Sequence, residues 1–450
     1  MGISRIFDIS RRSLATYQKA IDISSHNIAN AANANYTRQR AKISTEIPEK
    51  TAQFVWGTGV KIDGVDRVRD RLVEAQIISN SQSYSKYNKQ SIALGQVEQL
   101  FSEPSELGIG NLMTQFFNTW NELSVTPNSI ALRNNVIFAA QNLADKVKNV
   151  NNDLNTVKYD VFNEFKEKTD EVNTLLKEIN EYNRQIFSFK ATNQSPNDLL
   201  DERDKLVNDL SKLVNIKVHY DQNNMASISI GGVFAVDQSF TNSFEMQLLN
   251  GKLTLIASNN PNSIELSGGE LAALSDTYSN KITDYQSKLD AIFSKLVEET
   301  NSLHESGYNL NQTSGVKFFT DYSGGELIIN ENILSDPSLI AASSDGSSGN
   351  GQIARSIADI ADANILNGQT LSDNYASLVS TIGNQKLTSE KLAEANQMVL
   401  ENLETQRASI SSVSIDEEMT EIIKYQRSFD ASAKLIQIAN EMLEQIVGLI

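Results

Sequence analysis

Histidine, cysteine and clustered carboxylates carry most metal and acid–base chemistry in proteins, and this sequence offers few of them. It has no cysteine, which excludes disulfides, thiolate metal sites and cysteine nucleophiles. Its three histidines, His26, His219 and His304, lie far apart in sequence, and no two of them have the i, i+4 spacing with which a helix holds a metal. We therefore expect no metal site.

One acidic run could carry general acid–base catalysis. It is Asp201-Glu202-Arg203-Asp204, and its mixed charges are more typical of a solvated helix face with internal ion pairs, which is the interpretation we favour. The segment 221–224 lacks the acidic spacing and the closing glutamate of a calcium loop, and it predicts a hairpin turn instead. No glycine-rich phosphate loop occurs. The sequence thus predicts a protein that is not an enzyme and that uses no cofactor and no small-molecule substrate.

The composition is that of a folded, acidic protein. Of 450 residues, 40% are apolar, which is enough for a core, and the net charge of −17 disfavours nucleic acid and anionic membranes as partners. No stretch approaches the roughly 18 consecutive apolar residues of a membrane span. The first residues also lack the apolar region of a secretory signal peptide.

The two ends of the chain carry the same apolar pattern. Large apolar residues recur at every seventh position: Phe7, Leu14, Ile21 and Ile28 near the start, then Ile415, Ile422, Phe429, Ile436 and Leu443 near the end. A seven-residue apolar repeat makes a narrow stripe on a helix that must face another helix. We predict that the terminal helices pair as a coiled coil and that these residues form an assembly interface, as in filament subunits.

The two ends also carry opposite charge. Through Lys42 the chain has seven basic and two acidic residues, whereas from Ile415 onward it has seven acidic and three basic residues. Opposite charge favours pairing of the two unlike helices. Because an exposed ion pair contributes only about 0–1 kcal/mol, we expect charge to select the partner and the apolar seam to hold it.

The remaining pattern predicts a mainly α fold with a smaller β part. Helical periodicity over residues 129–190, 278–303 and 371–413 predicts a long antiparallel bundle, with one break expected near residues 149–152. A β-rich insertion follows the first of these segments, and its Asn250-Gly251 predicts a hairpin turn. We expect these parts: a terminal coiled-coil core domain, residues 1–45 and 414–450; a helical-bundle domain with short strands, 46–215 and 270–413; the β-rich insertion, 216–269; and a reduced irregular outer loop region, 309–351.

Motifs at both ends resemble the signatures of the bacterial flagellar axial proteins. Residues 25–30 read SHNIAN, residues 33–39 read NANYTRQ, and residues 425–434 read YQRSFDASAK. The family residues that these motifs match are Asn27, Asn30, Tyr36, Arg38 and Gln39 near the start, and Tyr425 and Gln426 near the end. The family usually has Pro-Gly where this chain has Ala34-Asn35, and asparagine also adopts the left-handed conformation that such a turn needs.

Inner segments narrow the resemblance to the hook-associated protein 1 (FlgK) family. They are residues 57–70, 198–211 and 267–274. The resemblance implies a structural subunit that is exported through the flagellar secretion channel and forms the junction between hook and filament outside the cell. It also implies four partners: further copies of the chain, the hook protein, the second hook-associated junction protein (FlgL), and an export chaperone (FlgN) on the C-terminal helix.

Two alternatives remain. The first is another flagellar axial protein, a hook or distal rod subunit, which the long helical bundle disfavours because the middle regions of those proteins are mostly β. The second is a secreted enzyme or an adhesin on a flagellar-type scaffold. A peptidoglycan hydrolase would need paired catalytic carboxylates or a metal triad, and the sequence suggests neither.

Overall fold

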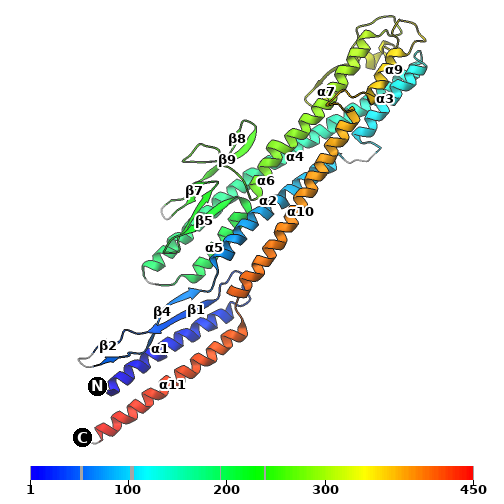
Figure 1. The fold of residues 1–450 in the computed structure, drawn as a ribbon. Coiled ribbons are helices and arrows are strands. Elements are labelled where there is room, and N and C mark those ends of the chain that lie inside the picture. Colours follow the sequence, from blue (N-terminus) through cyan, green and yellow to red (C-terminus); the bar gives the residue numbers. More distant parts are fainter. Residues whose placement is uncertain (1, 51–53, 102–105, 193, 238–239, 449–450) are drawn as a thin grey trace.

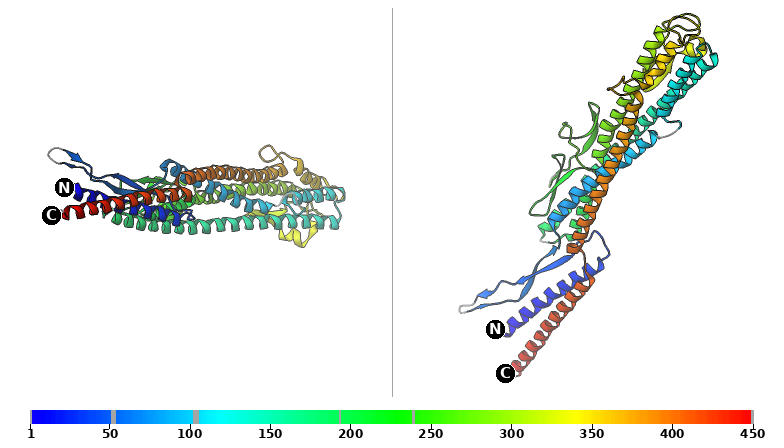
Figure 2. Two further views of the ribbon diagram at one scale, coloured as in Figure 1. Left: turned by 90° about the horizontal axis from the view of Figure 1, so that it is seen from below. Right: turned by 45° about the vertical axis from the view of Figure 1, so that its right-hand side comes forward.

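The computed structural model describes residues 2–50, 54–101, 106–192, 194–237 and 240–448. The molecule is elongated: a long bundle of helices carries at one end a smaller terminal unit that contains both terminal helices (Figures 1 and 2). The terminal unit consists of α1 (Gly2–Ala29), α11 (Ile415–Val447) and a β-ribbon that follows α1. The predicted mainly α fold with paired terminal helices is therefore confirmed.

The helices α1 and α11 pack side by side along the terminal unit (Figure 1). Tyr17 stacks on Tyr425 with 6.3 Å between the ring centroids, and this contact identifies the faces that meet. The buried residues at seven-residue spacing from these tyrosines are mostly small or polar: Ser10 and Ser24 on α1, and Glu418, Ser432 and Ala439 on α11. Small side chains at the centre of a helix pair let the two backbones approach closely.

The predicted apolar stripes consequently lie beside the centre of this contact, offset from Tyr17 and Tyr425 by three residues. The half-buried members are Phe7, Leu14, Ile21 and Ile28 on α1, and Ile422, Phe429 and Ile436 on α11. Ile415 and Leu443 are exposed. Bulky side chains fit at the edges of a close helix pair and not at its centre. The edges of the seam therefore keep apolar surface in contact with solvent.

The ion pairs made by the arginines of α1 differ from those predicted from the sequence. Arg5 and Arg12 of α1 pair with Glu49 and Glu46 of the ribbon, at 3.9 Å and 3.4 Å, and not with α11. The hypothesis that opposite charge selects the pairing of α1 with α11 is thus wrong for these two arginines. Arg38, just after α1, does pair with acidic residues of α11.

The ribbon lies along α1 and reaches toward its N-terminal end (Figure 1). Its strands are β1 (Gln39–Thr45) paired with β4 (Val60–Arg67), and β2 (Glu49–Lys50) paired with β3 (Val55–Trp56), all antiparallel. Thr16 Oγ1 donates to the Val60 carbonyl at 3.1 Å, and the Arg5 guanidinium lies 4.6 Å from the centroid of the Trp56 ring. Contacts along the length of α1 thus fix the ribbon against it.

The described part of the bundle is built around two large apolar cores and one small apolar cluster. Its long helices are α2 (Arg71–Phe101), α4 (Ile130–Ala191), α7 (Thr283–Ser306) and α10 (Leu371–Ser411), and its shorter ones are α3 (Ile109–Val125), α5 (Asn197–Leu213), α6 (Glu270–Asp276) and α9 (Gln352–Ala358). The predicted break near residues 149–152 is wrong, because Val150 and Leu154 are buried there and keep α4 continuous. Within the described ranges, no helix is both long and apolar enough to span a membrane.

The β insertion shares the second core with the bundle. Its strands are β5 (Ile216–Tyr220), β6 (Ala226–Ile230), β7 (Val233–Val236), β8 (Phe244–Leu249) and β9 (Lys252–Ala257), forming a three-stranded sheet β5–β6–β7 and a hairpin β8–β9. Asn250 and Gly251 both have positive φ, so the predicted hairpin turn is confirmed. Ile228 and Phe244 are buried in the same cluster as Phe165 of α4. The insertion is therefore part of the bundle's packing.

Residues 309–351, predicted to be an irregular loop, form an ordered cap on the end of the bundle that lies away from the terminal unit (Figure 1). We call this end the outer end. The cap contains β10 (Phe319–Ser323), β11 (Glu326–Ile329), α8 (Glu331–Ser335) and a 3₁₀ turn (Pro337–Leu339). Two buried side chains of α7 hold its backbone. The Asn301 amide oxygen accepts from the backbone N–H groups of Phe318 and Phe319 at 3.0 and 2.9 Å, and His304 Nε2 accepts from the Ala341 N–H at 2.9 Å. Sequence periodicity does not reveal such polar anchors.

We expect this outer end to lose stability as the pH falls from about 6.5 to about 4. Burial, together with the Arg133 guanidinium, lowers the pKa of His304 from 6.5 to about 4. Between these values the unfolded chain binds a proton that the folded chain does not. The free energy of unfolding therefore falls with falling pH, by roughly 3 kcal/mol in total.

Denaturant unfolding at a series of pH values measures this effect. Because carboxylates also titrate in this range, the informative quantity is the difference between the wild type and His304→Gln, whose pH dependence should be flatter. The exposed His219 offers a matched control, and His219→Gln should keep the wild-type slope. Equal slopes for the wild type and His304→Gln would contradict the assignment.

Candidate functional site

The turn that follows α1 is closed by one buried asparagine. Asn27 Nδ2 donates to the Gln39 carbonyl at 2.8 Å, and Asn27 Oδ1 accepts from the Gln39 N–H at 3.0 Å and from the Tyr36 hydroxyl at 2.8 Å. Tyr36 also contacts His26 Nδ1 at 3.0 Å, and Asn30 Nδ2 donates to the His26 carbonyl at 3.0 Å. These hydrogen bonds turn the chain from α1 back into β1. Three of the signature residues, Asn27, Tyr36 and Gln39, are thus joined by hydrogen bonds within this turn.

Arg38 joins this turn to the other end of the chain. Its Nε donates to Glu418 at 2.6 Å and its Nη1 to Glu417 at 2.7 Å, and both carboxylates belong to the first turn of α11. The Arg38 N–H also donates to the Ser411 carbonyl, the last residue of α10, at 2.9 Å. Arg38 therefore holds the turn after α1 against the short segment in which the chain leaves α10 of the bundle and enters α11.

The two C-terminal signature residues lie farther along α11. Tyr425 packs on Tyr17 in the centre of the helix pair, and burial with the nearby Glu421 carboxylate raises its pKa to about 12. Gln426 is exposed, and the structure does not bring it to the turn.

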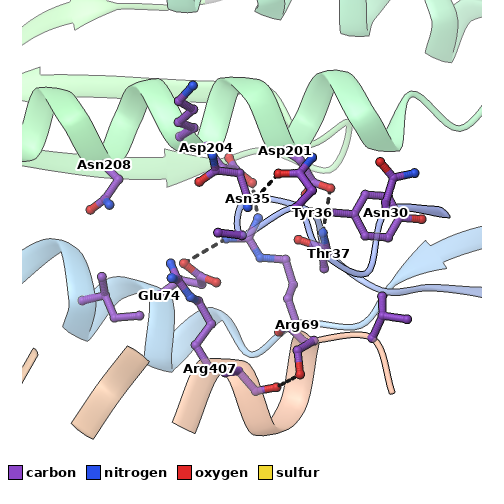
Figure 3. Close-up of a pocket in the computed structure, with 18 of the residues that line it drawn as sticks. Asn30, Asn35, Tyr36, Thr37, Arg69, Glu74, Asp201, Asp204, Asn208 and Arg407 are labelled. Carbon is purple, nitrogen blue, oxygen red and sulfur yellow. Dashed lines mark hydrogen bonds and ion pairs between the residues drawn. The ribbon is translucent and has the colours of Figure 1, made fainter. Parts of the chain in front are cut away.

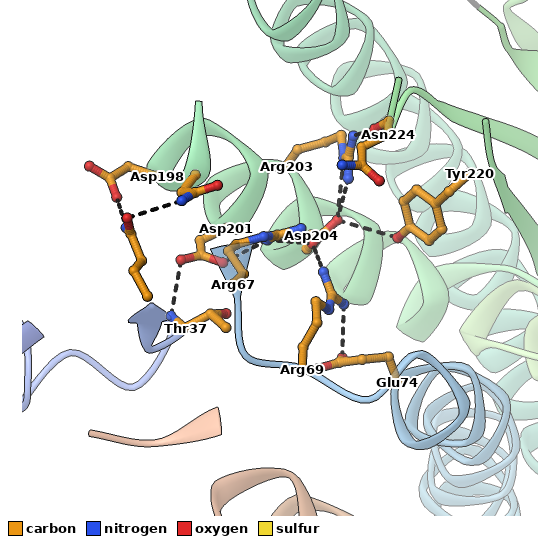
Figure 4. Close-up of polar contacts among 12 residues, drawn as sticks. Thr37, Arg67, Arg69, Glu74, Asp198, Asp201, Arg203, Asp204, Tyr220 and Asn224 are labelled. Carbon is orange, nitrogen blue, oxygen red and sulfur yellow. Dashed lines mark hydrogen bonds and ion pairs between the residues drawn. The ribbon is translucent and has the colours of Figure 1, made fainter. Parts of the chain in front are cut away.

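The acidic run of α5 holds the turn to the bundle (Figure 4). Asp201 Oδ2 accepts from the Thr37 N–H at 3.0 Å, and Asp201 Oδ1 accepts from Arg67 Nη1 at 2.7 Å. Gln39 Nε2 donates to Asp198 at 2.8 Å. Burial raises the pKa of Asp201 in spite of the Arg67 charge. We call this meeting of the turn, the end of β4 and α5 the joint.

Asp204 is the charge centre of the joint. Its carboxylate accepts from Arg67 Nη1 at 2.9 Å, from Arg203 Nη2 at 2.8 Å and from Arg69 Nη1, and the Tyr220 hydroxyl lies 3.3 Å away (Figure 4). Burial alone would raise the pKa of Asp204, but the three guanidinium groups lower it well below its usual range. The carboxylate thus stays ionised and balances three cations, two from the end of β4 and the segment after it and one from α5.

The interpretation of the acidic run as a solvated helix face is therefore wrong. Asp201 and Arg203 are buried, and the Asp204 side chain is only 15% exposed. Their partners Arg67 and Arg69 come from a segment more than 130 residues earlier in the chain. The sequence does show complementary charges: arginines at 67 and 69 and carboxylates at 201 and 204. The spacing of residues within each segment, however, does not show that the two segments meet in the fold.

A polar cavity of about 450 Å³ lies beside the joint, between the turn, the start of α2, α5 and the end of α10 (Figure 3). Arg69 reaches across it toward α5. Three buried atoms on its walls, Arg69 Nε, Asn208 Oδ1 and Ser411 Oγ, have no hydrogen-bond partner within the described part of the chain. The carboxylates of Asp201 and Asp204 are already bound to arginines, which suits them to structural ion pairing and not to proton transfer.

The described residues contain no group of three or more His, Cys, Asp or Glu side chains that could hold a metal ion. The signature residues Arg38 and Gln39 lead to α11 and to the joint, respectively. The arrangement of the joint orients the terminal unit on the bundle.

Comparisons with known proteins agree with these features. Residues 94–319, half of the chain, match the family described as "Flagellar hook-associated protein FlgK helical domain". Residues 404–449 match "Flagellar basal body rod FlgEFG protein C-terminal".

Relatives match along nearly the whole chain. It is 28% identical to flagellar hook-associated protein 1 of Bacillus subtilis, over 98% of this chain and 97% of the relative. It is 22% identical to that of Salmonella typhimurium, over 99% and 100%. The solved flagellar hook junction protein FlgK from Burkholderia pseudomallei has the same fold, with a TM-score of 0.66, 14% identity, and coverage of 76% of this chain and 100% of that chain. The chain belongs to the FlgK family of flagellar hook-associated proteins.

Proposed function

We propose that the chain is a structural subunit of the bacterial flagellum that forms the junction between hook and filament and assembles through α1 and α11. The observation that carries this proposal is the terminal helix pair, whose centre is closed within the chain while its apolar edges remain half-exposed. A soluble monomer gains nothing from apolar side chains kept at the edge of a seam, whereas a subunit that stacks on others buries them.

The joint supports the same role. A subunit that connects two tubes must transmit force between its inner helices and its outer body. Ion pairs of Arg67 and Arg69 with Asp204 tie the end of β4 and the segment after it to α5, and the ion pair of Arg38 with Glu418 ties the turn after α1 to α11. All three pairs are largely shielded from solvent. Rigid coupling of this kind suits a load-bearing element.

The partners in this proposal are further copies of the chain, the hook protein, the second hook-associated junction protein (FlgL), and the export chaperone (FlgN) on α11. The subunit is exported and acts outside the cell, at the hook–filament junction. Its role is structural and not catalytic. The Asp201 and Asp204 carboxylates of the joint are both engaged by arginine, which supports this assignment.

Imaging of flagella from a deletion strain tests the proposal. The strain should make hooks that carry no filaments and should release filament protein into the medium. Expression of the full chain from a plasmid should restore filaments. Normal filaments on the deletion strain would contradict the junction role.

A further inference from the structure

The outer part of the ribbon exposes large apolar side chains. Phe54 and Val55 are each 61% exposed and Ile47 is 75% exposed, although such residues are usually buried. Trp56 lies under the Arg5 guanidinium, and Phe54 packs on Trp56 with 5.7 Å between the ring centroids. The apolar surface is thus held in place against α1. Ordered apolar surface of this kind marks an interaction site.

The C-terminal half of α11 exposes a second apolar surface. Leu435, Ile438 and Met442 are 46%, 40% and 44% exposed, and Ile446 continues the row. Their spacing of three or four residues places them along one side of the helix. We call these four residues the α11 stripe.

The two surfaces lie at the same level of the terminal unit. Tyr17 faces Tyr425 in an antiparallel pair, and Arg5 precedes Tyr17 by twelve residues, so Arg5 is level with residues about twelve positions after Tyr425. That position falls within the α11 stripe. Glu49 of β2 and Trp56 of β3 contact Arg5, so this strand pair shares this level. In Figure 1 and in the right-hand view of Figure 2, the ribbon and α11 lie on opposite flanks of α1.

We propose that the strand pair β2–β3 of one copy docks on the α11 stripe of a second copy beside it. A ribbon and a helix that lie on opposite flanks of α1 at one level suit a head-to-tail contact between neighbouring copies, and such a contact repeats around a ring or a helical tube. Charge fits the same arrangement, because the exposed Lys50 lies on the ribbon and the exposed Glu441 lies beside the α11 stripe. The inference rests on the proposed function, since it names the neighbour that the assembled subunit meets.

Engineered cysteines test this contact without background, because the chain has no cysteine of its own. Flagella are isolated from cells making the full chain with both Val55→Cys and Ile438→Cys, and are then oxidised. A head-to-tail contact should give a ladder of covalent multimers larger than dimers. A mixture of the two single variants should give dimers only. Tyr17→Cys with Tyr425→Cys, within one copy, is the positive control for oxidation and should close without forming multimers.

Two results would overturn the proposal. The first is the absence of multimers from Val55→Cys with Ile438→Cys, and from the neighbouring pair Phe54→Cys with Met442→Cys, while the control pair closes. The second is a dimer from Val55→Cys alone, which would mean that two ribbons meet one another. In either case a normal amount of the chain in isolated flagella would leave the junction role standing, whereas its absence from flagella of the wild type would reject that role as well.

Discussion

Replacement of Asp204 by asparagine should lower the free energy of unfolding by about 3–5 kcal/mol, the usual cost of leaving buried charges without their partner. The asparagine side chain would keep the shape of the aspartate and lose its charge. Arg67, Arg69 and Arg203 would then face one another with less compensating charge. Urea unfolding followed by circular dichroism measures the change, and we expect the region around the joint to unfold first.

Asp209→Asn is the matched control, on the same helix. Asp209 is about two-fifths exposed and pairs with Lys212 one turn away, so its replacement should change the free energy of unfolding by no more than about 0.5 kcal/mol. An Asp204→Asn protein that unfolds at the same urea concentration as the control would contradict the account of the joint.

Phe429→Asp should abolish the junction while leaving the bundle folded. Phe429 is half-buried at the edge of the α1–α11 contact, where assembly would complete its burial. Full burial of such a side chain is worth about 1.5–3 kcal/mol, and a carboxylate at the same place adds a desolvation cost. Because every subunit of the junction carries the variant, the loss repeats at each contact. Hooks without filaments, together with secreted soluble subunit, are the expected observation.

The control for this variant is Thr420→Asp, which adds the same charge to an exposed position of the same helix. It should support normal filaments. Retention of the Phe429→Asp protein inside the cell would show that α11 acts first in export, through its chaperone. Normal swimming by the Phe429→Asp strain would contradict a role for this residue in either process.

The terminal helices and the bundle could be predicted from sequence because their patterns are local. A seven-residue repeat identifies a helix that needs a partner, and Asn250-Gly251 identifies a tight turn, whatever the rest of the chain does. The centre of the seam could not be predicted in the same way. Tyr17 and Tyr425 meet there with small and polar neighbours, and apolar periodicity points to the larger residues three positions away.

The ion pairs of the joint could not be predicted from the sequence for a related reason. Asp201 and Asp204 read as a solvated helix face, since the arginines that bury them are remote in sequence. Asn301 and His304 likewise hold the outer cap through backbone groups, and backbone donors and acceptors carry no sequence signal. Buried polar networks depend on the tertiary fold, so they emerge only once the elements are placed.

Hydrogen exchange on α1 and α11, in the free subunit and in isolated flagella, tests the central claim most directly. The described residues of α11 beyond Ala439 are all exposed, so few contacts hold this helix before assembly. We predict fast exchange of the backbone amides of Gly2–Ala29 and Ile415–Val447 in the free subunit, slow exchange in the bundle helices, and strong protection of both terminal helices in flagella. Terminal helices as protected in the free subunit as in flagella would contradict assembly through this pair.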